Sequence, residues 1–476
     1  MSPAFTVMQE LTIASHPSSA DAQSPSPSAS ATATFPQPLP ATEPGTAVST
    51  VCVVGLGYVG LPLSLQFAAS GLRVIGLDAD SAKVEALNHG RSYIRHIPSP
   101  AIQSAVASRR FFASGDWSRV AEASAIVIFV PTPLSPNREP DLSCVLDTGR
   151  AIAPHLRPGA LVVLESTSFP GTTDEELRRV LEAGSGRTAG RDFHLAFSPE
   201  REDPGNPGGG VGAIPKIVGG YTPACLERAL ALYGRAIRTL VPVSSCRVAE
   251  AAKLLENTFR SVNIALVNEL KLVYGAMGID IWEVIAAART KPFGFMPFFP
   301  GPGLGGHCIP IDPFYLTWKA REFGRHTRFI ELAGEINTAM PEHVLARVAE
   351  ALNHRRRALN GSRVLVVGLA YKPDVDDERE SPSYVLMEGL RRRGAEVGYH
   401  DPYIPVIRPT REHSQWAGTR SLPWTREVIS KCDAVIIATA HSNVNHRELI
   451  AWSPCIIDTR NVLGAVPARP GQVWKA

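Results

Sequence analysis

One cysteine of the chain lies in a stretch whose composition could expose its thiol to a ligand. The stretch GPGLGGHCIPIDP spans residues 301–313, so Cys308 follows a glycine-rich segment and precedes Asp312. Glycine allows a backbone to approach a ligand closely, and the two prolines stiffen the residues around them. A thiolate can bond covalently to a carbonyl carbon, and a nearby carboxylate can position or deprotonate water. The alternatives are a small buried cysteine and an aspartate that only fixes the loop.

A second group of polar residues belongs to a long helical pattern, AEAAKLLENTFRSVNIALVNELKLVYGAMG, which begins at residue 249. Lys253 and Asn257 share one face of this helix, where an ammonium and an amide could stabilise a negatively charged oxygen. An ordinary pair on a helix surface is the alternative. Thr167 in LESTSFPGTT and Glu200 in AFSPERED are candidates for handling water, with capping or loop roles as alternatives.

The sequence GLGYVG at residues 55–60 matches G-x-G-x-x-G. It follows an apolar run, opens a helical pattern and precedes Asp78, as in a dinucleotide-binding β-α-β unit. The helix N-terminus would bind a pyrophosphate, and Asp78 would accept hydrogen bonds from ribose hydroxyls and repel a 2′-phosphate. This favours NAD over NADP. The residues of the predicted cofactor site are Gly55, Gly57, Tyr58, Val59, Gly60 and Asp78.

A second β-α-β pattern begins at GSRVLVVGLAYKPD, where Gly368 is the only glycine of the expected loop. Without the other glycines we expect no second NAD there, but a different nucleotide. Lys372, Arg379 and Arg460 follow predicted strands and could contact it, although each could equally be a surface charge. We therefore expect an α/β fold with two Rossmann-like doubly wound domains, joined by central helices that could also form a dimer surface.

Composition excludes several classes of protein. The net charge is only +3 over 476 residues, which implies neither nucleic acid nor an anionic membrane as a partner. Seven scattered cysteines argue against a disulfide framework or a zinc site, so we expect no metal and a cytoplasmic location. The predicted regions are a disordered Ser/Pro/Ala-rich tail (1–48), an NAD-binding domain (49–222), a helical dimerisation domain (223–350) and a nucleotide-binding α/β domain (351–476).

Together these motifs resemble the UDP-glucose/GDP-mannose dehydrogenase family over about residues 50–465. The matching segments, in the order of the family, are GLGYVGLP, VPTPL, STSFPGTT, FSPER, ENTFRSVNIALVNEL, GPGLGGHCIPIDP, GLAYKPDVDDERESP and DTRN. The resemblance implies a UDP-sugar substrate, a homodimer or higher oligomer, and a role in surface polysaccharide synthesis. It also implies a four-electron oxidation of the sugar C6 alcohol to a carboxylate, which uses two NAD and one water.

The resemblance also implies roles for individual residues. Cys308 is the expected nucleophile of a thioester stage, and Lys253 with Asn257 is expected to stabilise charge on the C6 oxygen. Thr167, Glu200 and Asp312 are expected to handle water and protons, with their division of roles left open. The contact residues implied are Thr132 for the cofactor and Arg260, His307, Lys372, Arg379 and Arg460 for the substrate.

The cysteine segment departs from the UDP-glucose branch of the family. Ile311 stands where that branch has a lysine, and His307 precedes the cysteine, either as a substrate contact or base or as a residue that packs the loop. The segment resembles instead the branch that acts on UDP-N-acetylhexosamines. We expect UDP-N-acetylglucosamine first and the mannosamine epimer second, with the galactosamine epimer and UDP-glucose open. Two competing hypotheses are an enzyme that stops after two electrons and a non-catalytic sensor of NAD and nucleotide sugars.

Overall fold

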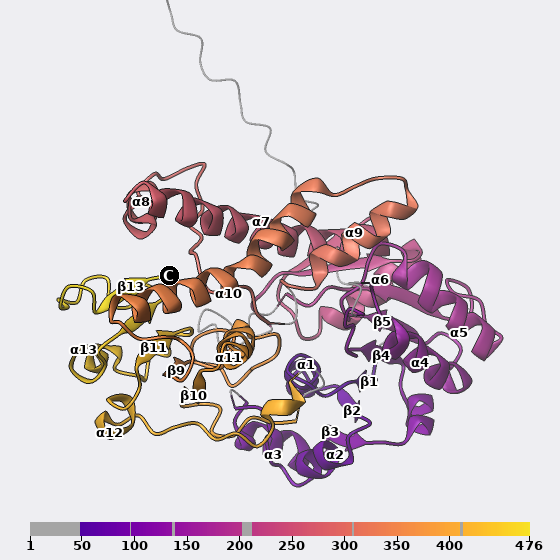
Figure 1. The fold of residues 1–476 in the computed structure, drawn as a ribbon. Helices are drawn as coiled ribbons and strands as arrows, with labels where there is room; N and C mark the ends of the chain where they lie inside the picture. The colour runs from indigo at the N-terminus through magenta and orange to yellow at the C-terminus, as the bar shows by residue number, and fades with distance from the viewer. Residues whose placement is uncertain (1–47, 96, 136–138, 202–211, 307–308, 410–412) are drawn as a thin grey trace, which may run out of the picture. The chain divides into compact units, whose positions relative to one another are not determined.

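The computed structural model describes residues 48–476 apart from 96, 136–138, 202–211, 307–308 and 410–412. All but the last residue of the predicted tail therefore lies outside the described residues, and so do His307 and Cys308. The described residues form two β-sheets and a set of long helices that comes between them in the sequence (Figure 1). The predicted fold class, two doubly wound α/β units connected by helices, is confirmed.

The first sheet has the strand order β3-β2-β1-β4-β5-β6-β7-β8. The part from β3 to β6 is parallel and has the order of a dinucleotide-binding fold, whereas β7 is antiparallel to β6. Successive residues of β1 point into two different apolar cores, because both faces of the sheet are covered. The strands are β1 (Thr50–Val54), β2 (Arg73–Leu77), β3 (Phe111–Ser114), β4 (Ala125–Ile128), β5 (Leu161–Leu164), β6 (His194–Phe197), β7 (Lys216–Gly220) and β8 (Leu240–Val243).

Helices cover both faces of this sheet. One of them, α6, lies against β6 and β7 and leads into β8, so the layer continues past residue 222, where we predicted a domain boundary. A boundary after Val243 keeps the whole sheet in one domain and fits it better. The helices are α1 (Gly60–Ala69), α2 (Ser81–Asn88), α3 (Ser99–Ala107), η1 (Trp117–Glu122), α4 (Ser143–Ile152), η2 (Ala153–His155), η3 (Thr172–Leu177), α5 (Arg178–Ser185) and α6 (Pro223–Tyr233).

The long central helix predicted from the sequence is α7 (Cys246–Ala276). It begins at Cys246 because the Ser245 hydroxyl accepts a hydrogen bond from the N–H of Val248, and it lies alongside α10 (Arg328–His354) (Figure 1). The other helices of this part are α8 (Ile281–Ala288) and α9 (Asp312–Glu322). No helix among the described residues has both the length and the apolar character needed to cross a membrane.

Helix α7 buries several polar residues and exposes several large apolar ones, unlike an ordinary surface helix. At 3.6 residues per turn, most of the exposed large apolar residues lie opposite the inward-facing polar residues. The inward-facing polar set is Glu250, Lys253, Asn257, Ser261, Asn268 and Lys271, of which Asn257 is half-buried and the others are buried. The exposed large apolar residues are Val248, Leu255, Phe259, Leu266, Leu272 and Val273, followed by Met277 at the C-cap, and all but Leu272 lie on the opposite face.

The second sheet is parallel throughout and has the order β10-β9-β11-β12-β13, which is the flavodoxin-like doubly wound order. In such sheets ligands bind outside the carboxyl ends of the strands, where the strand order reverses. Here that point lies between β9 and β11. The elements are β9 (Arg363–Val367), α11 (Pro382–Arg392), β10 (Glu396–His400), η4 (Ser414–Trp416), α12 (Arg426–Ile429), β11 (Ala434–Ile437), η5 (His446–Glu448), α13 (Leu449–Trp452), β12 (Ile456–Asp458) and β13 (Val473–Lys475).

Candidate functional site

The loop between β1 and α1 owes its shape to its glycines. Gly55 has a φ angle of +91°, and a Cβ atom there would lie 2.1 Å from the carbonyl oxygen of Phe129. A Cβ atom on Gly60 would lie 1.9 Å from the carbonyl oxygen of Gly55, so neither glycine can be replaced without a shift. Gly57 differs, because no heavy atom lies within 4 Å of its Cβ position. The backbone at Gly57 is therefore open to a ligand, as the pyrophosphate of NAD requires.

The end of β2 supports this loop. The Asp78 carboxylate accepts hydrogen bonds of 2.9 Å from the N–H groups of Leu56 and Asp80, one on each oxygen. Its side chain is 11% exposed, and the ammonium of Lys83 lies 3.7 Å away. A carboxylate oxygen can accept two hydrogen bonds, so both oxygens retain capacity for a ribose hydroxyl.

The remaining predicted cofactor residues adjoin the same loop. Tyr58 lies in the loop, and its ring faces the Arg379 guanidinium at 5.0 Å. Val59 precedes the first residue of α1, and no described side chain caps that helix. The N–H of Leu61 donates to the carbonyl oxygen of Gly57 at 3.2 Å and Pro62 has no N–H, so the N–H of Gly60 is the one left for a phosphate in this first turn. The buried hydroxyl of Thr132 has no hydrogen-bond partner in the described part of the chain, while the Thr132 carbonyl accepts a hydrogen bond from the Tyr315 hydroxyl at 2.9 Å. These residues fit a bound NAD.

Asp312 connects three of the predicted catalytic residues. It begins α9, is fully buried, and accepts a hydrogen bond of 2.6 Å on Oδ2 from the Asn257 side chain. Burial raises the pKa of Asp312 to about 6, against the opposing effects of the Lys253 charge and of hydrogen bonds from Asn257 and Thr167. Its Oδ1 atom has no partner with full hydrogen-bond geometry among the described residues. Thr167, Lys253, Asn257 and Asp312 therefore form one group that has an oxygen left to accept a proton.

Glu250, which was not predicted from the sequence, holds the loop that carries Thr167. One carboxylate oxygen accepts hydrogen bonds from the N–H and the hydroxyl of Thr173, at 3.0 and 2.7 Å, and the other accepts the N–H of Gly171 at 2.9 Å. Burial raises the pKa of Glu250 to about 8, although these hydrogen bonds oppose the shift. Its position one helical turn before Lys253 was the signal that could have identified it.

Glu200 belongs to a second group of charged residues at the carboxyl edge of the first sheet. It accepts the N–H of Arg201 at 2.7 Å, and the Lys216 ammonium lies 3.6 Å from its Oε2 atom. Lys216 also forms an ion pair of 2.6 Å with the buried Glu165. Neither Glu165 nor Lys216 was predicted from the sequence, because each occurs in an otherwise apolar stretch that reads as a strand.

The predicted substrate residues of the C-terminal part differ in how their charges are balanced. The Arg379 guanidinium makes two hydrogen bonds to the Asp377 carboxylate, at 2.8 and 2.6 Å, so a carboxylate already neutralises much of its charge. Arg460 is half-buried and donates from Nε to the carbonyl oxygen of Ala438 at 2.7 Å. Burial lowers its pKa to about 10. Arg460 is therefore better suited than Arg379 to bind an added anion.

Lys372 and Arg260 are two further predicted substrate residues. The ammonium of Lys372 lies 5.8 Å from the centre of the Tyr371 ring. Arg260 is exposed on α7, and its role stays a prediction.

The segment before Cys308 is tightly packed, although Cys308 and His307 themselves lie outside the described residues. A Cβ atom on Gly301 would lie 2.6 Å from an Arg460 guanidinium nitrogen, and Cβ atoms on Gly305 and Gly306 would contact Tyr371 at 2.7 and 2.8 Å. The N–H of Gly301 donates to the Asn268 side chain of α7 at 3.0 Å. These contacts explain why this segment needs glycines and bring it next to α7 and Arg460.

Lys271 is a further residue that the sequence did not single out. It is 8% exposed, and its ammonium nitrogen has no hydrogen-bond partner in the described part of the chain. Burial lowers its pKa to about 7, and the charges of Arg460 and Arg347 lower it further. Asp458 is a nearby negative charge that acts in the opposite direction. A buried amine is normally paired, so this region could accept a negatively charged ligand.

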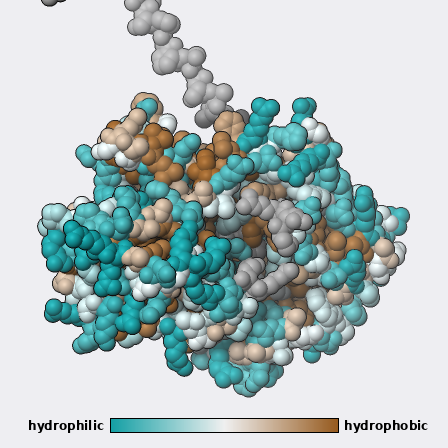
Figure 2. All heavy atoms as spheres, in the orientation of Figure 1, coloured by the Kyte–Doolittle hydropathy of each residue, from teal (hydrophilic) through white to brown (hydrophobic). Residues whose placement is uncertain are grey.

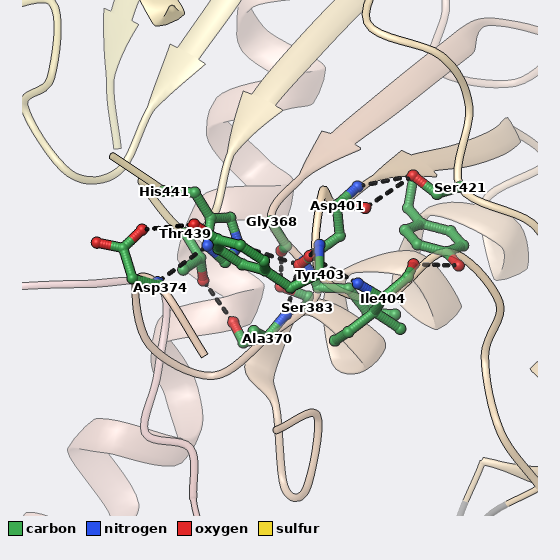
Figure 3. Close-up of polar contacts among 12 residues, drawn as sticks. Gly368, Ala370, Asp374, Ser383, Asp401, Tyr403, Ile404, Ser421, Thr439 and His441 are labelled. Carbon is green, nitrogen blue, oxygen red and sulfur yellow. Dashed lines mark hydrogen bonds and ion pairs between the residues drawn. The ribbon is translucent and has the colours of Figure 1, made fainter. Parts of the chain in front are cut away.

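The second β-α-β unit repeats the turn of the first loop, but its own chain occupies the aspartate beside that turn (Figure 3). Gly368 has a φ angle of +89°, and its N–H donates to the carbonyl oxygen of His400 at 2.8 Å. Asp401, at the end of β10, is buried and accepts hydrogen bonds from the N–H groups of Leu369 and Ala370 at 2.7 and 2.9 Å. Its remaining donors are the N–H groups of Tyr403 and Ile404, at 2.8 and 3.1 Å, and Nε2 of His441 at 3.0 Å.

His441 fixes this arrangement. Its Nδ1 atom accepts a hydrogen bond of 3.1 Å from the N–H of Asp374, so its Nε2 atom carries the proton that is donated to Asp401. The Asp401 carboxylate therefore has no free side toward a ligand. No group of three or more His, Cys, Asp or Glu residues suited to a metal ion occurs among the described residues.

Comparisons with known proteins agree with this geometry. Models of the UDP-glucose/GDP-mannose dehydrogenase family match in three parts: the NAD binding domain at residues 49–237, the central domain at 247–339 and the UDP binding domain at 365–465. The UDP-N-acetyl-D-glucosamine 6-dehydrogenase of Pseudomonas aeruginosa is 36% identical over 394 residues, which are 82% of this chain and 90% of that protein.

Two further relatives match over most of their length. The UDP-N-acetyl-D-mannosamine dehydrogenase of Escherichia coli K12 is 34% identical over 83% of this chain and 94% of its own length. The solved structure of UDP-D-ManNAc dehydrogenase from Pyrococcus horikoshii is 32% identical, with a TM-score of 0.80 over 89% of this chain and 98% of that one.

Proposed function

The chain belongs to the UDP-glucose/GDP-mannose dehydrogenase family and is an NAD-dependent nucleotide-sugar dehydrogenase, and from this premise we propose that it oxidises the C6 hydroxyl of a UDP-N-acetylhexosamine. The balanced reaction converts one primary alcohol, two NAD⁺ and one water into one carboxylate, two NADH and three protons. The product would be a UDP-linked uronic acid for polysaccharide synthesis. The glycine loop, Asp78 and Thr132 would hold NAD, which would be the hydride acceptor in each oxidation.

The grouping of Thr167, Lys253, Asn257 and Asp312 is the observation that carries this proposal. Binding alone needs no such group, because a buried carboxylate with an unused oxygen and a pKa near 6 suits proton transfer at neutral pH. Lys253 is buried and has no ion-pair partner within 4 Å among the described residues, so its charge remains available to a substrate oxygen. A silent sensor of NAD and nucleotide sugars is therefore less well supported.

The side chains would act in the following order. Lys253 and Asn257 stabilise negative charge on the C6 oxygen as the alcohol loses its proton. The Cys308 thiolate then adds to the aldehyde carbon and forms a thiohemiacetal, which becomes a thioester after the second oxidation. A water molecule cleaves the thioester, and Asp312 or Glu200, with Thr167 as a hydrogen-bonding group, takes the proton of this water.

An N-acetylhexosamine is favoured over glucose by the residues around Cys308 and by the names of the relatives. Ile311 lacks the charge of the lysine found in the UDP-glucose branch, and His307 is the other substitution in this segment. The relatives from Pseudomonas aeruginosa and Escherichia coli bear the names of N-acetylglucosamine and N-acetylmannosamine enzymes, respectively. We place UDP-N-acetylglucosamine first.

The reaction is tested by incubating the purified protein with NAD and a panel of UDP-sugars. We expect two NADH per sugar with UDP-N-acetylglucosamine and weaker turnover with its epimers or UDP-glucose. One NADH per sugar would indicate a two-electron enzyme, and no NADH with any UDP-sugar would refute the proposal.

Cys308→Ser tests the covalent stage. We expect this variant to bind the UDP-sugar as the unchanged protein does but to lose steady turnover by roughly 10²-fold or more, because a hydroxyl is a far weaker nucleophile than a thiolate. Cys144→Ser, at a half-buried cysteine outside the site, serves as the control. Turnover of Cys308→Ser near the unchanged rate would contradict the covalent mechanism.

We further propose a homodimer that buries the exposed apolar face of α7. The apolar residues of this face repeat at helical spacing, from Leu255 through Phe259 and Leu266 to Met277, and Figure 2 shows brown apolar surface over α7 and α8. Contiguous apolar surface of this kind usually marks a protein interface. A second copy is the favoured partner, because the same face of α7 can pack on itself about a two-fold axis.

Light scattering after size-exclusion chromatography tests this assembly. We expect twice the mass of one chain, or a multiple of it, for the unchanged protein. Leu266→Glu should shift the mass toward one chain, and Lys431→Glu, on the exposed surface of the C-terminal part, should not. A monomeric unchanged protein would refute the dimer.

We propose the cytoplasm as the location of the protein. The six described cysteines, Cys52, Cys144, Cys225, Cys246, Cys432 and Cys455, are all free thiols, as is usual in a reducing compartment. Detection of the protein in cell fractions would test this.

A further inference from the structure

The antiparallel step in the first sheet brings three charged side chains to one edge. Glu165 directly follows β5, and Glu200 lies shortly after β6. Because β7 runs antiparallel to β6, its first residue, Lys216, lies at the carboxyl end of β6, opposite Glu200 in the continued register. The two carboxylates therefore flank one ammonium group.

The contacts among these side chains form one connected network. The ammonium of Lys216 lies 2.6 Å from Oε2 of Glu165 and 3.6 Å from Oε2 of Glu200. The Tyr233 hydroxyl donates a hydrogen bond to the other oxygen of Glu165, and its ring lies 5.1 Å from the Lys216 ammonium. Tyr233 comes from α6, so a helix, two strands and a loop hold this group in place.

Glu200 is less buried than the other three side chains of this network. Glu165, Lys216 and Tyr233 are at most 5% exposed, whereas the Glu200 side chain is 12% exposed. A cavity of about 10 Å³, lined by residues 199–201 and 214–216, lies beside Glu200 and Lys216. This is about the space that one water molecule requires. Of these four side chains, Glu200 is therefore the one that can meet water.

The charges of this group depend on one another. Burial raises the pKa of Glu165 to about 7, although the Lys216 charge opposes the shift. Burial alone would lower the pKa of Lys216, but the two carboxylates outweigh it and raise this pKa. Arg201 is a further charged residue at this edge among the described ones, and it is paired with Glu256 of α7 at 2.6 Å. Lys216 is thus the cation shared by Glu165 and Glu200.

We propose that Lys216, fixed by Glu165 and Tyr233, is a positioning residue that holds the Glu200 carboxylate in the orientation needed to take a proton from the water that cleaves the thioester. This inference rests on the proposed function, in which Glu200 is one of two candidates for this proton transfer. It deepens that function by naming the residues that hold Glu200 in place.

Two substitutions separate a positioning role from a general structural one. Lys216→Met removes the ammonium that lies 3.6 Å from Glu200, so hydrolysis of the thioester should slow while the two oxidations do not. Glu165→Gln keeps this ammonium beside Glu200 and should slow hydrolysis less. A purely structural role would slow the oxidations and the hydrolysis together in both variants.

Rapid kinetics locate the step that is affected. In Lys216→Met we expect a burst of two NADH per active site at close to the unchanged rate, followed by steady turnover reduced roughly 10- to 100-fold, with little change in KM. The thioester on Cys308 should then accumulate and be detectable by mass spectrometry of the intact protein. Lys216→Arg should restore most of the steady rate, because it keeps the charge.

The double variant Glu165→Gln with Lys216→Met guards against misfolding, because it leaves no unpaired buried charge. It should fold as the unchanged protein does, give the same burst and hydrolyse slowly. Loss of the burst in this folded variant, hydrolysis slowed more by Glu165→Gln than by Lys216→Met, or unchanged hydrolysis in Lys216→Met would each overturn the proposal. Absence of any NADH from the unchanged protein would instead refute the proposed function, and this inference with it.

Discussion

The two doubly wound units of this protein make the same turn after their first strand and use it differently. Gly55 and Gly368 have φ angles of +91° and +89°, and the N–H of each donates 2.8 Å to the carbonyl oxygen of the last residue of the neighbouring strand. In both units an aspartate just after that strand, Asp78 or Asp401, accepts backbone hydrogen bonds from the loop. The backbone geometry is thus shared by both units.

The difference lies in what surrounds each aspartate. Asp78 accepts one hydrogen bond per oxygen from the chain and remains partly exposed beside the open Gly57. Asp401 is buried, and the chain occupies both of its oxygens, partly through His441. The same turn therefore leaves room for a ligand in the first unit and is a structural support in the second.

The largest effect that would test this contrast is expected from Asp401→Ala. It would leave buried N–H groups of the second loop without an acceptor, and we expect a loss of about 3–5 kcal/mol in the free energy of unfolding. Asp78→Ala is the matched control and should lose about 1 kcal/mol. Urea unfolding monitored by circular dichroism measures both. Equal losses would show that the two aspartates do not differ in role.

Gly57→Val tests whether the first loop is open for a ligand. The space around Gly57 accommodates the side chain without a clash, so the melting temperature should change little. The added methyl groups should displace the pyrophosphate, and we expect NAD to bind roughly 100-fold more weakly. UDP binding, measured by calorimetry on the same variant, is the control and should be unaffected. Unchanged NAD affinity would mean that the cofactor does not bind over Gly57.

Asp78→Ala should also change the choice of cofactor. Loss of the carboxylate removes hydrogen bonds to the ribose and the repulsion of a 2′-phosphate, so we expect NAD to bind about 10-fold more weakly while NADP binding improves. Titration of both cofactors into the variant measures the ratio. A ratio equal to that of the unchanged protein would assign Asp78 to loop support alone.

The smallest expected effect is on the stability of the protein at low pH. Hydrogen bonds from His441 and the backbone outweigh burial and hold the pKa of Asp401 below its usual value. A lowered pKa in the folded state contributes stability above the unfolded value, about 3.9, and this contribution is lost as the pH falls through the folded value.

His441→Leu removes one of these donors. As the pH falls from 6 to 3, the free energy of unfolding of this variant, relative to that of the unchanged protein, should therefore rise by about 1 kcal/mol. Unfolding free energies over this pH range measure the difference. A constant gap between His441→Leu and the unchanged protein would contradict the role given to this histidine.

Several features of the site could be predicted because they depend on residues close in sequence. The spacing of the glycines and of Asp78 belongs to one β-α-β unit, and the spacing of Lys253 and Asn257 belongs to one helix. Glu250 and Lys271 share the same helical period, yet they were missed because periodicity does not distinguish a buried polar face from an exposed one. In α7 these two polar residues lie among the buried ones, contrary to the usual pattern.

By itself the sequence determined the two α/β units, the long helix between them and the loop after β1, because local periodicity and glycine conformation dictate these features. Only the tertiary structure decided that Lys216 meets Glu165 and Glu200, since this contact requires β7 to run antiparallel to β6. It also decided that His441 donates to Asp401 and helps to leave this carboxylate no free side toward a ligand. A hydrogen bond between residues so distant in the chain forms only when the folded sheet brings them together.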